Sequence, residues 1–189
     1  MQGFTQIEGV DYDEIFVPVA KLSSLQAILA IAAEYNLEVH QMDIKSTYLN
    51  GELEEEIFME PPLSFDIPDG MVLRLIKAIY GTKQEGCVWY NNIRTTLKTM
   101  GYTCTESDHA IFIHFQDGKV SIIALYVDDF TMACEDLAII EQDKEELKKH
   151  YQMTDLGELT WILGMHVTWD HKAGQIDLSQ QKYIKEILK

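Results

Sequence analysis

The sequence is poor in cysteine and in long apolar runs, and each shortage excludes a class of protein. Its three cysteines are an odd number and include no Cys-x-x-Cys pair, so we expect neither a disulfide framework nor a zinc site. A reducing compartment fits this content best. No apolar run approaches the length that spans a bilayer, and the first residues lack the charged start and apolar block of a secretory signal. We therefore expect no membrane partner.

Positive charge is also scarce. The chain has 15 lysine and arginine residues against 31 aspartate and glutamate residues, a formal net charge of −16. A protein that holds nucleic acid usually carries a basic track that neutralises phosphates, so composition alone argues against such a partner. With 189 residues, 47% of them hydrophobic, the chain is long enough for one domain or a compact pair of subdomains with a proper core.

Apolar patterning predicts helices that alternate with antiparallel hairpins, and hence an α+β fold. The first helix should follow Ser23 and Ser24, which we expect to cap it, and apolar residues on more than one of its faces predict deep burial. Further helices are expected over 89–100, over 137–151 and from Gln180 onwards. Strands are expected over 38–43, 71–76, 110–115, 120–127, 130–134, 159–169 and 175–178. These elements predict an antiparallel sheet with helices packed on one face.

Two adjacent carboxylates, Asp128 and Asp129, follow directly on the largely apolar segment 122–127. Carboxylates at the tip of a buried hairpin lose hydration and repel each other, so a compensating group is expected. A hard cation such as Mg2+ prefers carboxylate oxygens and would compensate. Because side chains alternate along a strand, the two carboxylates cannot aim equally at one point, and a carboxylate from another strand is needed. Asp43, at the end of the strand 38–43, is the natural candidate.

A plainer interpretation is that the adjacent aspartates form a solvated turn. The apolar residues around the pair and the second strand-end aspartate, Asp43, argue against it. Two metal ions held by such carboxylates could activate an attacking hydroxyl and stabilise a leaving pyrophosphate.

The sequence also resembles a known family over nearly its whole length. The resemblance rests on short motifs that occur in the family's order and spacing. They are Gly3-Phe4-Thr5-Gln6, 40–51, 79–84, Trp89-Tyr90, Tyr126-Val127-Asp128-Asp129, Asp155-Leu156-Gly157-Glu158, Ile162-Leu163-Gly164-Met165 and Leu178-Ser179-Gln180. Together they resemble the copia-type reverse transcriptase domain of long-terminal-repeat retrotransposons.

The resemblance implies a polymerase palm with part of the fingers, in a single domain fragment over 1–189. Residues 52–84 would form a fingers-like insertion and residues 160–178 a primer-grip-like hairpin. The N-terminal fingers, thumb and RNase H regions would be missing from this chain. Because those regions would carry much of the phosphate contact, their absence would explain why acidic residues outnumber basic ones in this chain. The acidic runs 52–56 and 141–146 are then expected to be solvated faces away from the template.

The resemblance also implies a metal site. Asp43 and Asp128 would hold two Mg2+ ions, for which Mn2+ could substitute. Asp129 would be a weaker or supporting ligand, and the backbone carbonyl of Ile44 a further one. All three aspartates would be catalytic.

Other residues would contact the nucleotide and the primer. Tyr48 would be a steric gate against the nucleotide 2′-hydroxyl, and Gln84 and Tyr126 would touch the incoming nucleotide. The primer would contact Ile162, Leu163 and Gly164. Without the resemblance, plain core packing would be an alternative for Tyr48 and Leu163.

The implied activity is RNA-directed DNA polymerisation. A primer 3′-hydroxyl would attack the α-phosphate of a deoxynucleoside triphosphate in line, directed by an RNA or DNA template. The implied partners are the primer and template, the deoxynucleoside triphosphates, and the remaining polyprotein domains, namely thumb, RNase H and integrase. The implied location is a cytoplasmic virus-like particle or the nucleus.

Two alternatives belong to other classes. One is a degenerate or repurposed palm remnant that binds partners without polymerising, which the acidic surface and the missing ends favour. The other is a metal-dependent cyclase or hydrolase with a similar palm, which the turn and grip motifs do not support. The intact aspartates and Tyr48 favour the polymerase.

Overall fold

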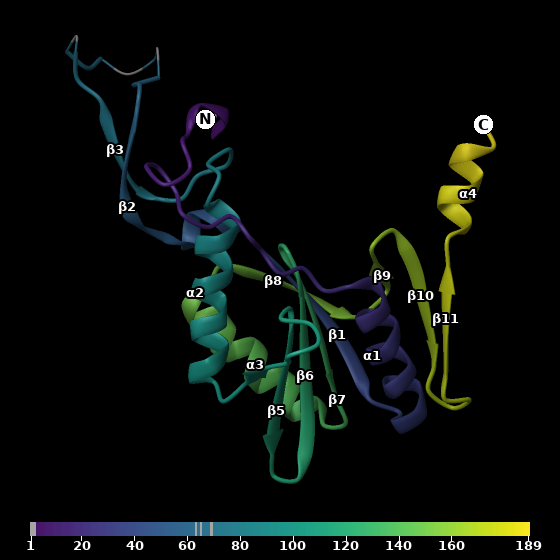
Figure 1. The fold of residues 1–189 in the computed structure, drawn as a ribbon. Coiled ribbons are helices and arrows are strands. Elements are labelled where there is room, and N and C mark those ends of the chain that lie inside the picture. The colour runs from purple at the N-terminus through teal and green to yellow at the C-terminus, as the bar shows by residue number, and fades with distance from the viewer. Residues whose placement is uncertain (1–2, 63, 65, 69) are drawn as a thin grey trace. The chain divides into compact units, whose positions relative to one another are not determined.

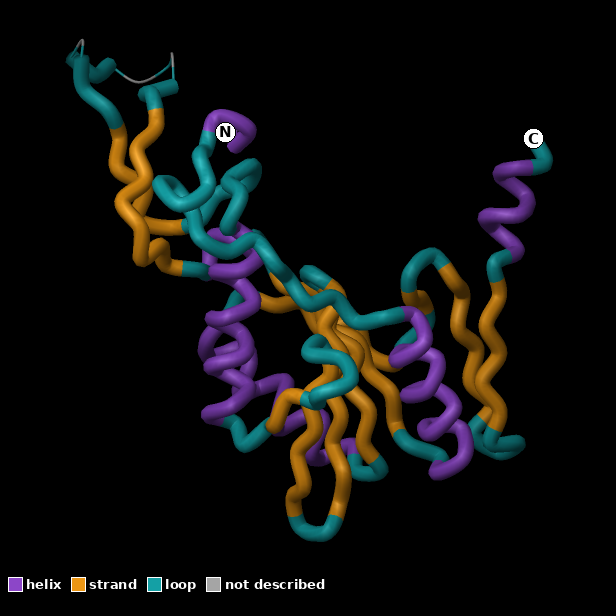
Figure 2. The backbone as a smooth tube through the Cα atoms, viewed as in Figure 1, coloured by secondary structure: helices purple, strands orange, loops and turns teal. Residues whose placement is uncertain are grey.

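The computed structural model describes residues 3–62, 64, 66–68 and 70–189, and the chain divides into two compact units. The first unit comprises residues up to Pro18 together with Ser46–Thr96, and the second comprises Val19–Lys45 and Leu97–Lys189. Figure 1 labels the helices and strands, and Figure 2 colours them by type. Within the described ranges, no helix is both long and apolar enough to cross a bilayer.

The second unit is built on a six-stranded sheet in the order β4-β5-β6-β7-β1-β8, in which every neighbouring pair is antiparallel. Its strands are β1 (Glu38–Ile44), β4 (Thr103–Cys104), β5 (Ile111–Gln116), β6 (Lys119–Tyr126), β7 (Asp129–Cys134) and β8 (Met153–Glu158). The predicted hairpin turn at Asp117 and Gly118 is confirmed, and both residues have positive φ, 53° and 79°. The first strand of the sequence, β1, lies between β7 and β8, so residues far apart in the chain become neighbours.

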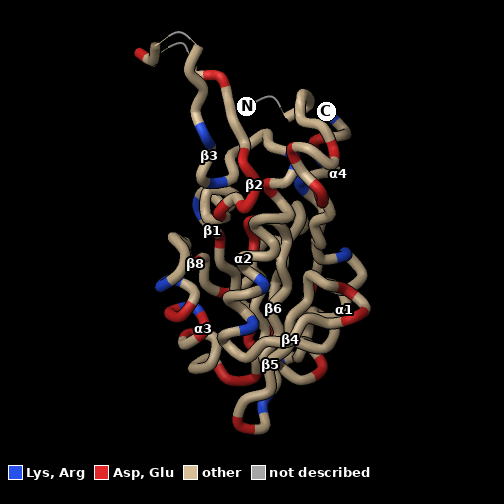
Figure 3. The backbone as a smooth tube through the Cα atoms, turned by 60° about the vertical axis from the view of Figure 1, so that its left-hand side comes forward, with Lys and Arg blue, Asp and Glu red and all other residues tan. Residues whose placement is uncertain are grey.

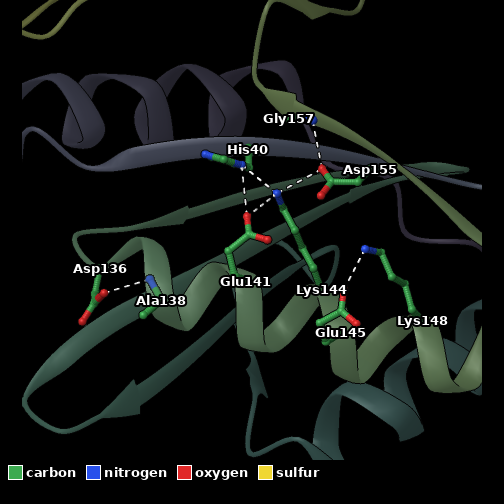
Figure 4. A network of polar contacts seen from close by, with 9 residues as sticks. All are labelled: His40, Asp136, Ala138, Glu141, Lys144, Glu145, Lys148, Asp155 and Gly157. Carbon is green, nitrogen blue, oxygen red and sulfur yellow. Dashed lines mark hydrogen bonds and ion pairs between the residues drawn. The ribbon is translucent and has the colours of Figure 1, made fainter.

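Helices lie on both sides of this sheet. α3 (Leu137–His150) packs against β7, β1 and β8. α1 (Leu22–Tyr35) contacts β7 and lies on the other side of β1 from α3 in Figure 4. The prediction of helices on one face is therefore wrong. The physical reason is that the paired Val39 and Ala133, on the face away from α3, are also buried and need cover.

The N-terminus of α1 is held by a residue that is distant in the sequence. Ser23 and Ser24 do not cap the helix, because it begins at Leu22 and both serines lie in its first turn. Instead, the Oδ2 atom of buried Asp108 accepts from the Ser24 hydroxyl at 2.6 Å and from the backbone N–H of the N-cap residue, Lys21, at 2.9 Å. The expected deep burial is also wrong, since Ile31 is 42% exposed.

A three-stranded sheet completes the second unit, in the order β11-β10-β9, followed by α4 (Gln181–Ile187). Its strands are β9 (Trp161–Ile162), β10 (Met165–Asp170) and β11 (Gln175–Ser179). The single strand predicted over 159–169 is thus two strands. Leu163 and Gly164 have positive φ of 48° and 76°, and the chain reverses there.

The first unit contains the β2–β3 hairpin, most of α2 and two short 3-10 helices. The bounds are η1 (Gly3–Thr5), η2 (Thr47–Asn50), β2 (Glu52–Met59), β3 (Leu73–Lys77) and α2 (Glu85–Thr99). β3 agrees with the strand predicted over 71–76, whereas β2 was not predicted because its four glutamates resemble a solvated charge run. Residues 63, 65 and 69 of the predicted insertion 52–84 lie outside the described residues.

A buried lysine connects α3 to the sheet. The side chain of Lys144 is 1% exposed, and its Nζ lies 2.7 Å from His40 Nδ1, 2.8 Å from Glu141 Oε1 and 3.0 Å from Asp155 Oδ1, as Figure 4 shows. An ammonium group only donates, so His40 Nδ1 accepts and its ring is neutral. The run 141–146 is therefore not a fully solvated face.

The neighbouring Asp143 departs from the expected solvated face for a similar reason. Its side chain is buried, and Oδ2 accepts from the Tyr102 hydroxyl at 2.5 Å. Burying these polar groups is tolerable because each has a partner inside the unit.

The stability of the chain should depend on pH through His40. Burial of the ring, and then the nearby Lys144, lower the pKa of His40 from its ordinary value of 6.5. As pH falls the unfolded chain binds this proton first, so the free energy of unfolding should decrease from about pH 6.5 down to the folded pKa. Above that window His40 should add no pH dependence.

Urea unfolding between about pH 5 and pH 8 measures this effect. The natural sequence should lose more stability towards low pH than His40→Gln, whose amide oxygen can still accept from Lys144. Equal losses in the two proteins would contradict the assignment to His40.

Candidate functional site

The two adjacent aspartates lie at a tight turn between β6 and β7. Tyr126 pairs with Asp129, so Val127 and Asp128 alone make the turn. Val127 has a φ of 57°, which is unfavourable for a β-branched residue. Such strain persists only where the surrounding structure enforces it, and it is concentrated at functional sites. The β6–β7 hairpin therefore holds both aspartates in one local geometry.

Asp43 lies beside this turn on the neighbouring strand. Asp43 and Asp129 are direct partners in the β1–β7 register, so their side chains project from the same face of the sheet. The Gln41 amide, two residues earlier on that face, donates from Nε2 to Asp129 Oδ1 at 3.3 Å. Like charges placed directly opposite each other destabilise a sheet, so this pairing is costly unless something neutralises it.

The electrostatic cost is visible at Asp129. Burial raises the pKa of Asp129, and the carboxylates of Asp43 and Asp128 raise it further, against the opposing effect of the hydrogen bond from Gln41. The charged form is therefore disfavoured at this position in the protein alone. A bound cation would reverse that balance, because its charge is the largest in such a site.

Asp128 carries a buried polar atom that makes no hydrogen bond. Its Oδ1 atom is buried and has no hydrogen-bond partner in the structure. Its backbone carbonyl accepts from the N–H of Ile44 at 3.0 Å, which fastens the turn to the end of β1, next to Asp43. A buried oxygen without a partner costs about 1–3 kcal/mol, so it calls for a specific explanation, and a cation is one.

Magnesium fits these donors. Mg2+ is usually held by one or two carboxylates, while water and substrate phosphates complete its octahedral shell. Within the described part of the chain, no three His, Cys, Asp or Glu side chains converge as a complete metal site. A preference for few carboxylates and for water or phosphate oxygens is compatible with the opposed pair Asp43 and Asp129 and with the unpartnered oxygen of Asp128.

The predicted nucleotide contacts Tyr48 and Gln84 belong to the first unit. The Tyr48 ring packs edge-on against Tyr80, with centroids 4.9 Å apart. Gln84 is buried: its Oε1 accepts from the Gln6 amide at 3.0 Å and its Nε2 donates to the Asp11 carbonyl at 3.1 Å. Since the carboxylates belong to the second unit, the contact of Tyr48 and Gln84 with a nucleotide bound there stays a prediction.

Tyr126 and the predicted primer contacts belong to the second unit. Tyr126 ends β6 beside the carboxylate turn and is 36% exposed. Ile162 is buried at the end of β9, and Leu163 and Gly164 form the turn into β10. Contact of these residues with nucleotide or primer stays a prediction.

A groove next to that turn was not predicted from the sequence. It is lined by Trp161, His166, Ser179, Gln181, Lys182 and Lys185, none of them acidic. Trp161 is 43% exposed, and Lys182 Nζ lies 5.7 Å from the centroid of its ring. Exposed aromatic faces with adjacent cations are typical of surfaces that bind nucleic-acid strands. The spacing of Lys182 and Lys185, i and i+3 on the helix expected from Gln180 onwards, was a signal in the sequence, whereas the exposure of Trp161 had none.

Comparison with known proteins identifies the family. The family model described as "Reverse transcriptase (RNA-dependent DNA polymerase)" matches residues 1–189. The chain belongs to the reverse transcriptase family. The predicted family is confirmed, and reverse transcriptases are RNA-directed DNA polymerases that generally use divalent metal ions.

Relatives of this reverse transcriptase chain are transposon proteins. It is 40% identical to "Retrovirus-related Pol polyprotein from transposon TNT 1-94" of Nicotiana tabacum, over 100% of the chain and 14% of the polyprotein. It is 31% identical to the corresponding polyprotein from transposon RE2 of Arabidopsis thaliana, over 99% of the chain and 13% of that protein. The putative transposon Ty5-1 protein of Saccharomyces cerevisiae is 34% identical over 76% of the chain and 47% of its own length. The chain thus spans a small part of the Pol polyproteins that it matches.

Proposed function

We propose that this chain is the catalytic palm region of a copia-type polyprotein and adds deoxynucleotides to a primer 3′-hydroxyl. The observation that carries the proposal is the buried, unpartnered Oδ1 of Asp128, at a turn fastened to the strand of Asp43. A solvated aspartate turn, the plainer alternative, would leave that oxygen in water. Membership of the reverse transcriptase family supports the same chemistry.

The carboxylates would hold two Mg2+ ions, or Mn2+ in their place. Asp43 and Asp128 would be the principal ligands, with Asp129 and the carbonyl of Ile44 in support. When bound, the ions would supply activation of the attacking hydroxyl and neutralisation of the leaving pyrophosphate. The protein would supply no covalent nucleophile. It would hold the primer end and the nucleotide in line, which is where most of the remaining rate acceleration arises.

The groove lined by Trp161, Lys182 and Lys185 supports a nucleic-acid partner despite the net charge of −16. Trp161 offers a face on which a base could stack, and Lys182 and Lys185 offer charge for phosphates. The adjoining turn at Leu163 and Gly164 would contact the primer end. The template would be read by base pairing, so few contacts to base edges are needed.

The wider assignment is part of the same proposal. We propose that thumb, RNase H and integrase domains of a polyprotein are partners, and that 52–84 and 160–178 act as fingers-like insertion and primer-grip hairpin. The enzyme would work in a cytoplasmic virus-like particle or in the nucleus.

A second candidate is a palm remnant that binds partners without polymerising. The observation that favours it is the abundance of acidic residues, which Figure 3 shows on many of the labelled elements, β2 among them. A phosphate backbone would be repelled by such a surface.

Primer extension separates the two candidates. The chain should incorporate deoxynucleotides on a primed RNA template when Mg2+ or Mn2+ is present, and not when the metal is chelated. If thumb and N-terminal fingers segments from a relative are fused to the chain and no incorporation follows, the polymerase proposal fails and the remnant is favoured.

Tyr48 should control the choice of sugar. A flat ring at the gate would exclude the 2′-hydroxyl by contact, so Tyr48→Ala should admit ribonucleotides. We expect discrimination, the ratio of kcat/KM for dNTP over NTP, to fall by at least about tenfold, the size of a single lost steric contact. Tyr80→Ala, which removes the neighbouring ring, is the matched control and should change the ratio less. Unchanged discrimination in Tyr48→Ala would refute the gate.

A further inference from the structure

The edge of the six-stranded sheet carries a β-bulge beside the carboxylate site. In the β1–β8 register, Gln41 pairs with Gly157 and Met42 pairs with Asp155, so Leu156 is an extra residue in β8. The bulge lies immediately before the pair Asp43–Thr154. Bulges re-aim side chains and are over-represented next to active sites. Whatever holds this bulge therefore influences where Asp43 points.

Asp155 organises the bulge from within. Its Oδ1 accepts from the backbone N–H of Gly157 at 2.9 Å, across the extra residue Leu156. Gly157 has a φ of 73°, a conformation that glycine adopts without strain. The segment Asp155-Leu156-Gly157, one of the motifs noted in the sequence, is thus a built turn inside a strand.

Lys144, on α3, contacts the same oxygen of Asp155. Its Nζ reaches Asp155 Oδ1 on β8 at 3.0 Å and His40 Nδ1 on β1 at 2.7 Å, and Glu141 Oε1 is 2.8 Å away (Figure 4). The lysine therefore links β1 to β8 at the position where their pairing is interrupted by the bulge. The Lys144 side chain is 1% exposed, so water has little access to its ammonium group, whereas the Asp155 side chain is 30% exposed.

Lys144 does not belong to the carboxylate site itself. His40 and Met42 alternate with Gln41 and Asp43 along β1, so the lysine and the carboxylates lie on opposite faces of the sheet. It therefore cannot contact a metal ion or substrate bound by Asp43. Any effect on the site must pass through the strand.

We propose that Lys144 is a positioning residue, which, by joining Asp155 to His40, fixes the bulged register of β1 against β8 and thereby the direction in which Asp43 points. A buried ion pair contributes little net stability compared with apolar packing, and its best-attested use is to specify one arrangement among several. Here the arrangement specified is the bulged register. The metal-binding part of this proposal rests on the proposed function, whereas the register part does not.

Hydrogen exchange in the metal-free chain tests the register. The amides of Ile44 and Lys45 bond to the carbonyls of Asp128 and Gln152 and report on β1 next to Asp43. In Lys144→Met these amides should exchange at least about tenfold faster relative to the amides of β5 and β6 in the same protein. The internal reference removes any general loss of stability.

The matched control is Lys148→Met, one turn further along α3. It removes the same charge from an exposed pair with Glu145, 2.8 Å apart, and should leave the exchange ratio unchanged. If Lys144→Met accelerates all strands equally, the lysine is merely a stabilising residue and the proposal is overturned.

Mn2+ affinity, followed by electron paramagnetic resonance, gives the second readout. Lys144→Met should bind Mn2+ about 10- to 100-fold more weakly, as is usual when a group supporting metal ligands is lost, while Lys148→Met should match the natural chain. Unchanged Mn2+ affinity in a folded Lys144→Met protein would overturn the metal-binding part of the proposal. If Asp128→Asn binds Mn2+ as well as the natural chain does, the proposed function fails, and the exchange ratio still decides the role of Lys144.

A milder variant covers the case in which Lys144→Met does not fold. Asp155→Asn keeps an oxygen for the Gly157 N–H but removes the charge that faces Lys144. It should shift the exchange ratio of Ile44 and Lys45 in the same direction, by about threefold, a change of about 0.7 kcal/mol. No shift in this variant would overturn the proposal.

Discussion

Replacing Asp128 with asparagine should lower primer extension on an RNA template by at least about a thousandfold, equivalent to about 4 kcal/mol of transition-state stabilisation. Asparagine has nearly the same shape, so the bond from the Ile44 N–H to the carbonyl of residue 128 and the turn at Val127 should persist. What is lost is the negative charge that would hold the metal ions. Single-nucleotide incorporation under saturating primer-template measures the effect.

The matched control is Asp117→Asn. Asp117 lies in the other tight turn of the same sheet, between β5 and β6, and its substitution removes the same charge. It has a φ of 53°, which asparagine tolerates well, so this variant should fold and extend primers within about twofold of the natural rate. Equal incorporation by the Asp128 variant and the natural chain would mean that a contaminating polymerase is being measured, or that Asp128 holds no metal.

Replacing Phe130 with alanine should give the largest loss of stability, about 3–5 kcal/mol. Phe130 directly follows Asp129 on β7, is 0% exposed, and is the register partner of both Met42 and Leu125, which are buried too. The truncation would leave a cavity in the middle of the sheet, and its neighbours, fixed in three paired strands, could not collapse to fill it. Urea unfolding measures the loss.

Phe115→Ala is the control for side-chain size. Phe115 lies on β5 of the same sheet and is 74% exposed, so its truncation should change the free energy of unfolding by no more than about 0.5 kcal/mol. A similar loss in both variants would show that the sheet core is not where the structure places it.

Local signals in the sequence predicted the parts of the fold that are determined locally. The Asp117-Gly118 pair specifies a tight turn by its own backbone preferences, and largely apolar runs on either side of that turn and after Asp129 identified β5, β6 and β7. The proximity of Asp43 to Asp129 is a long-range fact. It was predicted because the adjacent pair Asp128 and Asp129 needs a further carboxylate from another strand, and the family resemblance supported it. The register of β1 against β7 agrees with this prediction.

Other features had no local signal. β8 was overlooked because Leu156 is extra, which breaks the alternation by which strands are recognised. The support of α1 by Asp108 joins residues from distant parts of the chain. In the sequence, Lys144 is one charge among many on a predicted helix. Only the fold reveals that His40 and Asp155 both contact its ammonium group.

The position of β1 has a consequence for folding. β1 is made early, yet its two partners, β7 and β8, come much later in the chain. Pairing across such sequence separations requires closure of long loops, which slows folding. During synthesis β1 therefore has both edges unpaired, and open to pairing with wrong strands, until β7 and β8 have been made. The carboxylate site and the core that supports it are completed in the same late step, so in a chain that has not finished folding Asp43 does not yet lie opposite Asp129.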